Sequence, residues 1–192
     1  MRDNPMPQPV LLHDESGEIL EPLQLGDVKL YPAPALSRFI LRARPQGLHV
    51  MAKTLGISPP DPLRASSFKD HHLLWQGPDE WLLLAPYDEK EDIKSRIADA
   101  MASHPHALVD VSHRHHAFLL TGKTVENLLS CHCMLDLSLQ AFPVAMTTRT
   151  LFAKAELTLW RIDEHTFHIE LWRSYAAYVI GLLREGADTL PD

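Results

Sequence analysis

FILRARPQGLHVMAKTLG at residues 39–56 and HHLLWQGPDEWLLLAP at residues 71–86 decide the fold, because a similar pattern recurs later in the chain. AFLLTGKTVENLLSCHC occupies residues 117–133, and KAELTLWRIDEHTFHIELW occupies residues 154–172. Aromatic positions of the two copies coincide in three pairs: Phe39 with Phe118, Trp75 with Trp160, and Trp81 with Phe167. Each copy is typical of strand, helix, hairpin and helix. Two such units usually form one body with its functional groove between them.

The first copy follows the periods of the elements it predicts. Residues 38–43 alternate apolar and polar side chains, which is typical of a half-buried strand. Apolar residues at helical spacing follow over 48–55, and Gly56 comes where a helix end favours a left-handed residue. GPDE at 77–80 lies between two apolar runs and predicts a hairpin turn.

A charged helix is predicted over 88–103 and a final helix over 174–185, with Ser174 as its N-cap. The final helix should bury one stripe made of Tyr175, Tyr178, Val179, Leu182 and Leu183. Helices packed on one side of mainly antiparallel sheets make an α+β fold. We therefore expect an α+β protein made of two similar strand-helix-hairpin-helix halves.

Composition excludes several classes of partner. The chain has 192 residues, 45% of them hydrophobic, and a formal net charge of −7. Nucleic acids and anionic membranes require clustered Lys and Arg, which this sequence lacks. No apolar run approaches the roughly 20 residues that span a bilayer, and the first residues do not form a signal peptide. Cys131 and Cys133 are poorly spaced for a mutual disulfide and suit a reducing compartment. We expect a cytoplasmic protein.

Proline marks the domain organisation. Ten of the fifteen prolines precede residue 63, and six of them lie in the first 35 residues. Residues 1–35 are therefore predicted to be an extended arm outside the core. Residues 36–188 are predicted to form one compact domain, with halves at 36–105 and 106–188.

The densest polar motif is DVSHRHH at 110–116, with Asp110, His113, His115 and His116. Imidazole and carboxylate are good ligands for zinc or iron. On a strand, however, His113 and His115 share one face and His116 points to the other. No second ligand cluster at a usual spacing completes a coordination sphere, so we favour a turn whose polar groups bond backbone and solvent.

Two weaker motifs remain. Cys131 and Cys133 flank His132 and could supply a nucleophile beside a base, but a free Cys after an apolar helix face is more often a small buried hydrophobe. Arginine forks bind carboxylates such as those of folates, and they equally close salt bridges at strand ends. We favour the salt bridges, with Arg173 as the best exception. The arginines concerned are Arg149, Arg161 and Arg173.

Four blocks together resemble the gamma subunit of heterotetrameric sarcosine oxidase, over roughly residues 36–185. They are WQGPDEWLLLAP, HALVDVSHRHHAFLLTG, LDLSLQAFPV with TRTLFAKAELTLWR, and FHIELWRSYAAYVIGLL. The DVSH block, followed by an apolar strand, a glycine and a helix ending in LDL, is also similar to the folate-binding aminomethyltransferase of the glycine cleavage system. That similarity implies an aminomethyltransferase-like folate-binding fold.

The resemblance implies an accessory subunit of a flavoprotein complex in sarcosine catabolism. Such a complex oxidises sarcosine to glycine, hydrogen peroxide and either formaldehyde or methylene-tetrahydrofolate. It implies alpha, beta and delta subunits as partners, which would carry FAD, FMN, NAD, tetrahydrofolate and zinc, while this chain alone binds no cofactor or metal and has no catalytic residue. If a folate groove persists here, the resemblance and the arginine chemistry place it at Asp110, His113 and Arg173. The alternative is a stand-alone folate-dependent aminomethyl or methylene transferase.

Overall fold

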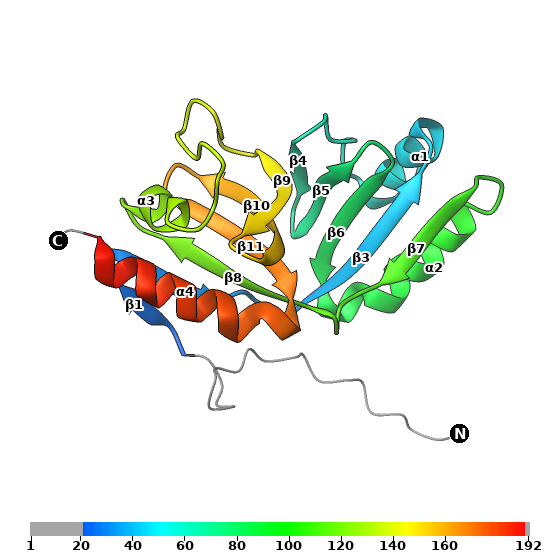
Figure 1. Cartoon of the computed structure of the whole chain (residues 1–192). Coiled ribbons are helices and arrows are strands. Elements are labelled where there is room, and N and C mark those ends of the chain that lie inside the picture. Colours follow the sequence, from blue (N-terminus) through cyan, green and yellow to red (C-terminus); the bar gives the residue numbers. More distant parts are fainter. Residues whose placement is uncertain (1–20, 191–192) are drawn as a thin grey trace, which may run out of the picture.

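The structure is a computed structural model that describes residues 21–190. Within this range the chain forms two antiparallel sheets, which Figure 1 shows side by side. Helices α1 (Pro45–Leu55) and α2 (Lys90–Ala100) cover one sheet, and α3 (Val125–Ser130) and α4 (Ala176–Thr189) cover the other. The predicted α+β class is confirmed.

The first sheet has five strands in the order β4-β5-β6-β3-β7. Its strands are β3 (Leu36–Ala43), β4 (Ala65–Phe68), β5 (His71–Gly77), β6 (Glu80–Pro86) and β7 (His106–Asp110). The second sheet has six strands in the order β1-β2-β8-β11-β10-β9. These are β1 (Leu23–Leu25), β2 (Val28–Pro32), β8 (His115–Thr121), β9 (Thr147–Phe152), β10 (Ala155–Asp163) and β11 (Thr166–Trp172).

The duplication read in the sequence is present in the topology. The order β4-β5-β6-β3 in the first sheet matches β9-β10-β11-β8 in the second. The structure adds an exchange between the halves. β2 precedes β3 in the chain but pairs with β8, and β7 precedes β8 but pairs with β3. Each half therefore completes the sheet of the other, which locks the two together.

Because of this exchange, the predicted halves of the chain do not coincide with the two sheets. The limits 36–105 and 106–188 remain a prediction for the chain, but the sheets divide differently, because β7 belongs to the first sheet. A short apolar strand carries no information about which edge it joins.

The predicted arm at residues 1–35 is wrong where β1 and β2 lie, while residues 1–20 fall outside the described range. Leu25, Val28 and Leu30 are buried in the core, and Leu30 pairs with Leu120 of β8. The prolines of this region led to the prediction of an arm instead of a strand, and one of them, Pro32, is the last residue of β2. Proline is tolerated at such strand ends and edges.

The helix ends agree with the sequence in one place and differ in another. Gly56 ends α1 with a left-handed φ of 73°, as predicted, and its N–H donates to the carbonyl of Lys53. The final helix instead begins at Ala176, after a 3₁₀ turn (η2, Arg173–Tyr175) that contains Ser174. Ser174 is therefore not the N-cap.

The predicted stripe of the final helix is also shifted. Tyr175 and Tyr178 are 38% and 39% exposed, and the buried positions are Ala176, Val179, Ile180, Leu183 and Gly186. A 3₁₀ turn has three residues per turn instead of 3.6, so it changes the phase at which the helix enters. A matching turn (η1, Tyr87–Glu89) precedes α2.

Three apolar clusters form the core of the described part of the chain, residues 21–190. One lies between the second sheet and α3 with α4, and another between the first sheet and α1 with α2. The third lies between the two sheets and contains Leu74, Leu82, Leu84, Val111 and Trp160. The sheets thus pack on each other by their inner faces, with the helices outside.

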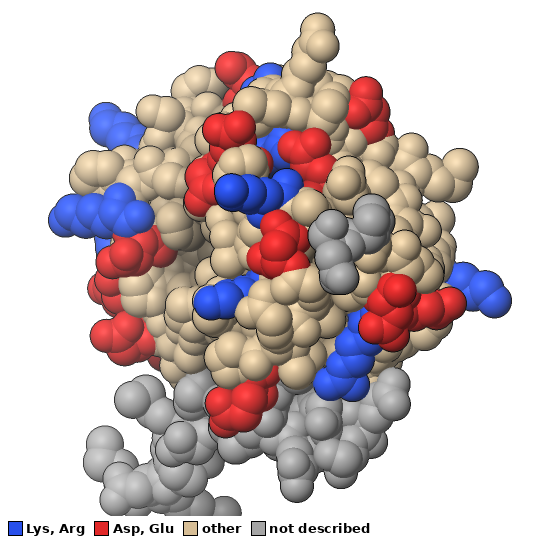
Figure 2. Space-filling model, turned by 90° about the vertical axis from the view of Figure 1, so that its left-hand side faces the viewer, with Lys and Arg blue, Asp and Glu red and all other residues tan. Residues whose placement is uncertain are grey.

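No helix among residues 21–190 is long and apolar enough to cross a membrane. On the face seen in Figure 2, acidic and basic side chains are interspersed rather than gathered into one basic area.

Candidate functional site

The inner face of β11 carries two buried polar groups of the interface between the sheets. His168 and Glu170 alternate along this strand with the apolar Phe167, Ile169 and Leu171, which face the helices. A strand directs successive side chains to opposite faces, so one strand serves both layers. The carboxylate of Glu170 is completely buried.

Glu170 is held by two partners in what we call the buried ion cluster, Arg38, His168 and Glu170. Arg38 Nε donates to Glu170 Oε2 at 2.7 Å, and His168 Nε2 lies 2.8 Å from Oε1. Although burial opposes ionisation, Arg38 and His168 hold the pKa of Glu170 at about 2, well below its usual range. An ionised carboxylate only accepts hydrogen bonds, so Nε2 of His168 carries the proton.

His115, at the start of β8, lies beside this cluster without joining it. Its Nδ1 is 3.9 Å from Glu170 Oε2, which is too far for a hydrogen bond. Burial lowers the pKa of His115 to about 4, and the attraction of Glu170 does not offset this. The imidazole is therefore neutral at neutral pH. Neither ring nitrogen has a hydrogen-bond partner among the described residues.

Asp110 ties the end of β7 to α2. Lys90 Nζ lies 2.6 Å from Asp110 Oδ2, while the backbone N–H and the hydroxyl of Ser112 donate to Oδ1 at 3.0 and 2.7 Å. Partial burial opposes ionisation, but these bonds hold the pKa of Asp110 below its usual value. The Ser112 hydroxyl also accepts from the N–H of Arg38 at 3.0 Å. Asp110 thus braces the turn beneath the buried ion cluster.

His113 and Arg173 lie near this turn but outside the core. Both are exposed, His113 in the turn and Arg173 in η2, whose N–H donates to the carbonyl of Arg114 at 2.9 Å. The four candidate ligands of DVSHRHH do not converge on one point. Asp110 ends β7 and His113 lies in the turn, whereas His115 and His116 belong to β8. Within residues 21–190, no group of three or more His, Cys, Asp and Glu could hold a metal ion.

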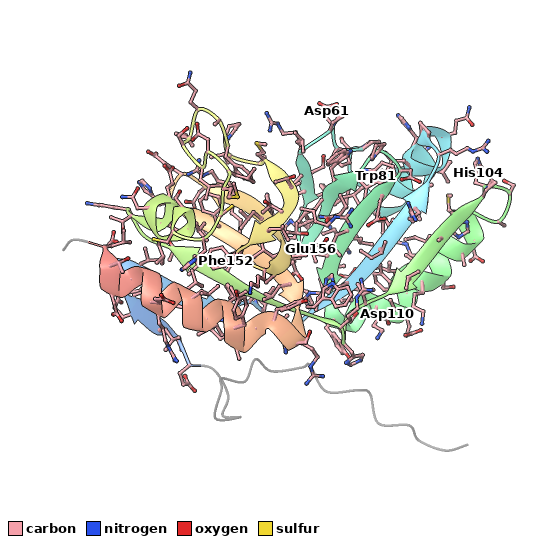
Figure 3. All side chains as sticks on the ribbon, in the orientation of Figure 1. Asp61, Trp81, His104, Asp110, Phe152 and Glu156 are labelled. Carbon is pink, nitrogen blue, oxygen red and sulfur yellow. The ribbon has the colours of Figure 1, made fainter. Side chains whose placement is uncertain are left out.

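A cleft of about 350 Å³ opens between the sheets on one side of the buried ion cluster; we call it the inter-sheet cleft. It is lined from the first sheet by residues such as Gln76 and Glu80, and from the second by residues such as His115, Glu156 and Glu170. Glu156 lies between the sheets in Figure 3. Asp110, His113 and Arg173 are not among the described residues that line it, although their neighbours Val109, Val111, Arg114 and Trp172 are.

A second cavity, of about 630 Å³, lies on the other side of the cluster; we call it the aromatic cavity. His72 packs on Trp160 with ring centroids 4.9 Å apart, and Trp160 packs on His168 at 5.7 Å. Burial, followed by His168, lowers the pKa of His72. His168 lines this cavity and Glu170 lines the inter-sheet cleft, so the buried ion cluster separates the two.

The other arginines and the cysteines take structural positions. Arg149 Nη1 donates to Glu80 at 3.3 Å at the rim of the inter-sheet cleft. Arg161 is fully buried, pairs with Glu126, and donates to the carbonyl of Phe142 at 2.6 Å. For Arg149 and Arg161, the structure therefore has the salt bridges that we favoured from the sequence. Cys133 is buried, as expected of a small hydrophobe, whereas Cys131 is exposed.

Sequence reasoning missed the buried ion cluster. Arg38 and Glu170 are 132 residues apart in the chain and belong to different copies of the repeat. The available indication was the polar pair in FHIEL, because the first copy has Leu82 and Leu84 at the positions that match His168 and Glu170.

The architecture is shared with solved structures. The chain superposes on aminomethyltransferase T of the glycine cleavage system from Bartonella henselae with a TM-score of 0.60 and 11% identity, covering 80% of this chain and 44% of that one. It superposes on a chain of heterotetrameric sarcosine oxidase from Corynebacterium sp. U-96, in complex with pyrrole 2-carboxylate, with a TM-score of 0.78 and 24% identity. That match covers 86% of this chain and 87% of the other. The class is therefore the aminomethyltransferase-like α+β fold.

The sequence comparisons define the family. Residues 43–188 match the model of the sarcosine oxidase, gamma subunit family. A sarcosine oxidase subunit gamma from Corynebacterium sp. (strain P-1) is 27% identical over 159 residues, covering 81% of this chain and 77% of the relative. One from Arthrobacter sp. is 30% identical over 97 residues, covering 50% of this chain and 47% of the relative. The chain belongs to the sarcosine oxidase gamma subunit family.

Proposed function

We propose that this chain is the accessory, non-catalytic gamma subunit of a heterotetrameric sarcosine oxidase. The observation that carries the proposal is the family match over residues 43–188, which includes both copies of the repeat except β3, of which only Ala43 is matched. The buried polar groups of the interface support it. Arg38 and His168 pair with the carboxylate of Glu170, and Lys90 and Ser112 bind the carboxylate of Asp110. Both carboxylates therefore take part in contacts within the fold.

The proposal extends to the partners. We infer that alpha, beta and delta chains complete the complex and that FAD, FMN, NAD, tetrahydrofolate and zinc are bound there, in the cytoplasm. The reaction of the complex would be the oxidative demethylation of sarcosine. The gamma chain would contribute a surface and a rigid double-sheet body, held by the exchange of β2 and β7 between the halves.

A folate groove at Asp110, His113 and Arg173 stays a prediction, and the residues as placed do not favour it. The carboxylate of Asp110 already accepts three polar contacts, and His113 and Arg173 are exposed outside the lining of the inter-sheet cleft. We derive no folate chemistry for this chain.

Co-expression of all four chains, with and without this one, tests the proposal. We expect a stable heterotetramer only when this chain is present, and no sarcosine-dependent hydrogen peroxide from the chain purified alone. Titration of the isolated chain with tetrahydrofolate, followed by tryptophan fluorescence, tests the alternative function of a stand-alone transferase. Saturable quenching that Asp110→Ala abolishes would support a stand-alone folate-dependent transferase instead.

A further inference from the structure

The inter-sheet cleft contains two buried side chains whose hydrogen bonds are incomplete. Gln76 is 7% exposed; its Oε1 accepts from the Thr158 hydroxyl at 3.0 Å, while its Nε2 has no partner among the described residues. The side chain of His115 is 10% exposed, and both of its ring nitrogens lack partners. A buried polar group without a hydrogen bond costs about 1–3 kcal/mol. The cleft therefore has uncommitted polar groups at its base.

The same cleft has one uncommitted group of each charge. Arg114 lines it and lies 5.1 Å from the ring centre of Trp172, without an ion pair among the described residues. Glu156 lines it from β10 and is exposed, also without a described partner. The other carboxylates of the lining are engaged, Glu80 by Arg42 and Arg149, and Glu170 within the buried ion cluster.

We propose that the inter-sheet cleft binds a small α-amino acid in its zwitterionic form. The carboxylate of the ligand would accept hydrogen bonds from Arg114, Gln76 and His115. Its ammonium group would pair with Glu156. This site is separate from the accessory role proposed above and does not depend on it.

The balance of charges and the size select this class of ligand. A lone anion would leave Glu156 unpaired, and a lone cation would leave Arg114 and the neutral donors unpaired. Charge-assisted hydrogen bonds are roughly twice as strong as neutral ones, so a ligand that carries both charges can make both of these stronger contacts. A volume of about 350 Å³ holds a small amino acid and several waters, each of which takes about 30 Å³ of liquid volume.

Binding to the full-length chain is measured by equilibrium dialysis with labelled glycine, with acetate and methylamine as the two half-ligands. We expect saturable glycine binding with a dissociation constant below about 10 mM, or about 2.7 kcal/mol. Acetate and methylamine should each bind at least about tenfold more weakly, since each makes only one of the two charged contacts. Inorganic phosphate should not compete at equal concentration.

Substitutions at two exposed residues of the cleft should affect the binding of different half-ligands. Glu156→Gln should weaken glycine to the level of acetate and leave acetate unchanged. Arg114→Gln should weaken glycine and acetate alike, by about tenfold or more, and leave methylamine unchanged. The matched controls are Glu164→Gln in the β10–β11 turn and Arg184→Gln on α4, both exposed and outside the cleft, and both should bind glycine normally.

The buried donors are tested with Gln76→Leu, which should weaken glycine while thermal unfolding confirms a folded chain. The proposal is overturned if glycine shows no saturable binding up to about 50 mM, a limit near 1.8 kcal/mol. It is equally overturned if phosphate competes as well as glycine does, or if Glu156→Gln and Arg114→Gln both bind glycine like the parent.

Discussion

β6 and β11 occupy the same place in the two halves, yet their inner faces have opposite characters. Both present an apolar row to their helices, with Leu83 in one matching Ile169 in the other. Towards the opposite sheet, β6 presents Leu82 and Leu84, while β11 presents His168 and Glu170. The repeat has therefore kept the pattern that folds each half and has changed the surface where the halves meet.

The difference has a counterpart on the neighbouring strands. Arg38 of β3, which neutralises Glu170, corresponds in the repeat to Ala117 of β8. The polar groups thus occur as a complementary set, with the cation on one copy and the carboxylate on the other. A buried ion pair is weak evidence for stability, but removing one partner is costly. The set makes the two halves non-interchangeable.

The largest expected effect comes from breaking this set. Arg38→Ala should lower the free energy of unfolding by about 3–5 kcal/mol, because it leaves the Glu170 carboxylate buried without its cation. The triple variant Arg38→Ala, His168→Leu, Glu170→Leu gives each copy the residues that the other copy has at these positions. It should lie within about 1–2 kcal/mol of the parent, since an apolar replacement of a buried pair is often neutral. Urea unfolding measures both, and a triple variant as unstable as the single one would contradict this account.

The helix-facing rows should respond alike. Leu83→Ala and Ile169→Ala each remove buried methyl groups from fully buried positions, so each should cost about 2–5 kcal/mol. The two losses should agree within about 2 kcal/mol, the spread that such substitutions show at different buried sites of one protein. Denaturant unfolding of the two variants is the measurement. A near-neutral result for one of them would show that the halves are not equivalent on this face.

Gly122 allows the close approach of the exchanged strand β2 to the second sheet. A Cβ there would lie 2.7 Å from the carbonyl oxygen of Asp27 and 2.7 Å from Cα of Val28, so β2 would have to move. Gly122→Ala should cost about 1–3 kcal/mol and speed amide exchange in β1 and β2. Gly77→Ala is the control, because its Cβ would meet only Glu80 at 3.9 Å. Equal effects of the two substitutions would argue against the close approach.

The smallest effect concerns acid stability. The pKa of His115 is about 4 in the folded chain and near 6.5 when unfolded, so the unfolded chain takes up more protons between these values. Stability from this residue is therefore complete above pH 6.5 and is lost as the pH falls towards 4. Between pH 7 and pH 5 the loss should be at most about 2 kcal/mol.

Replacing His115 with Gln should remove that part of the pH dependence. The charged groups around it, Glu170, Arg38 and Arg114, would remain. Unfolding curves at the two pH values compare the variant with the parent. An unchanged difference between pH 7 and pH 5 would show that His115 does not titrate as described.

Much of this fold could be predicted from the sequence because it depends on local periods. The strand predicted at residues 38–43, the turn at GPDE and the glycine that ends α1 all follow from spacing. The strand exchange could not be predicted, since neither β2 nor β7 contains information about its partner. The buried stripe of α4 could not be predicted either, because no residue there indicates the 3₁₀ turn that changes where the helix begins.

The candidate site was less predictable for a related reason. The sequence singled out Asp110 as a candidate ligand-binding residue, but its pairing with Lys90, which comes from a different element, could not be predicted. Arg38 and Glu170 each looked like an ordinary polar position of an alternating strand. Their pairing depends on how two sheets meet, which is a property of the tertiary structure alone.

The most direct test of the proposed role is native mass spectrometry of the complex purified through a tag on this chain. The account predicts a single heterotetramer that contains one copy of the chain and all of the sarcosine-dependent peroxide activity, with none in the free chain. Recovery of the chain alone, in a form that itself oxidises sarcosine, would contradict it.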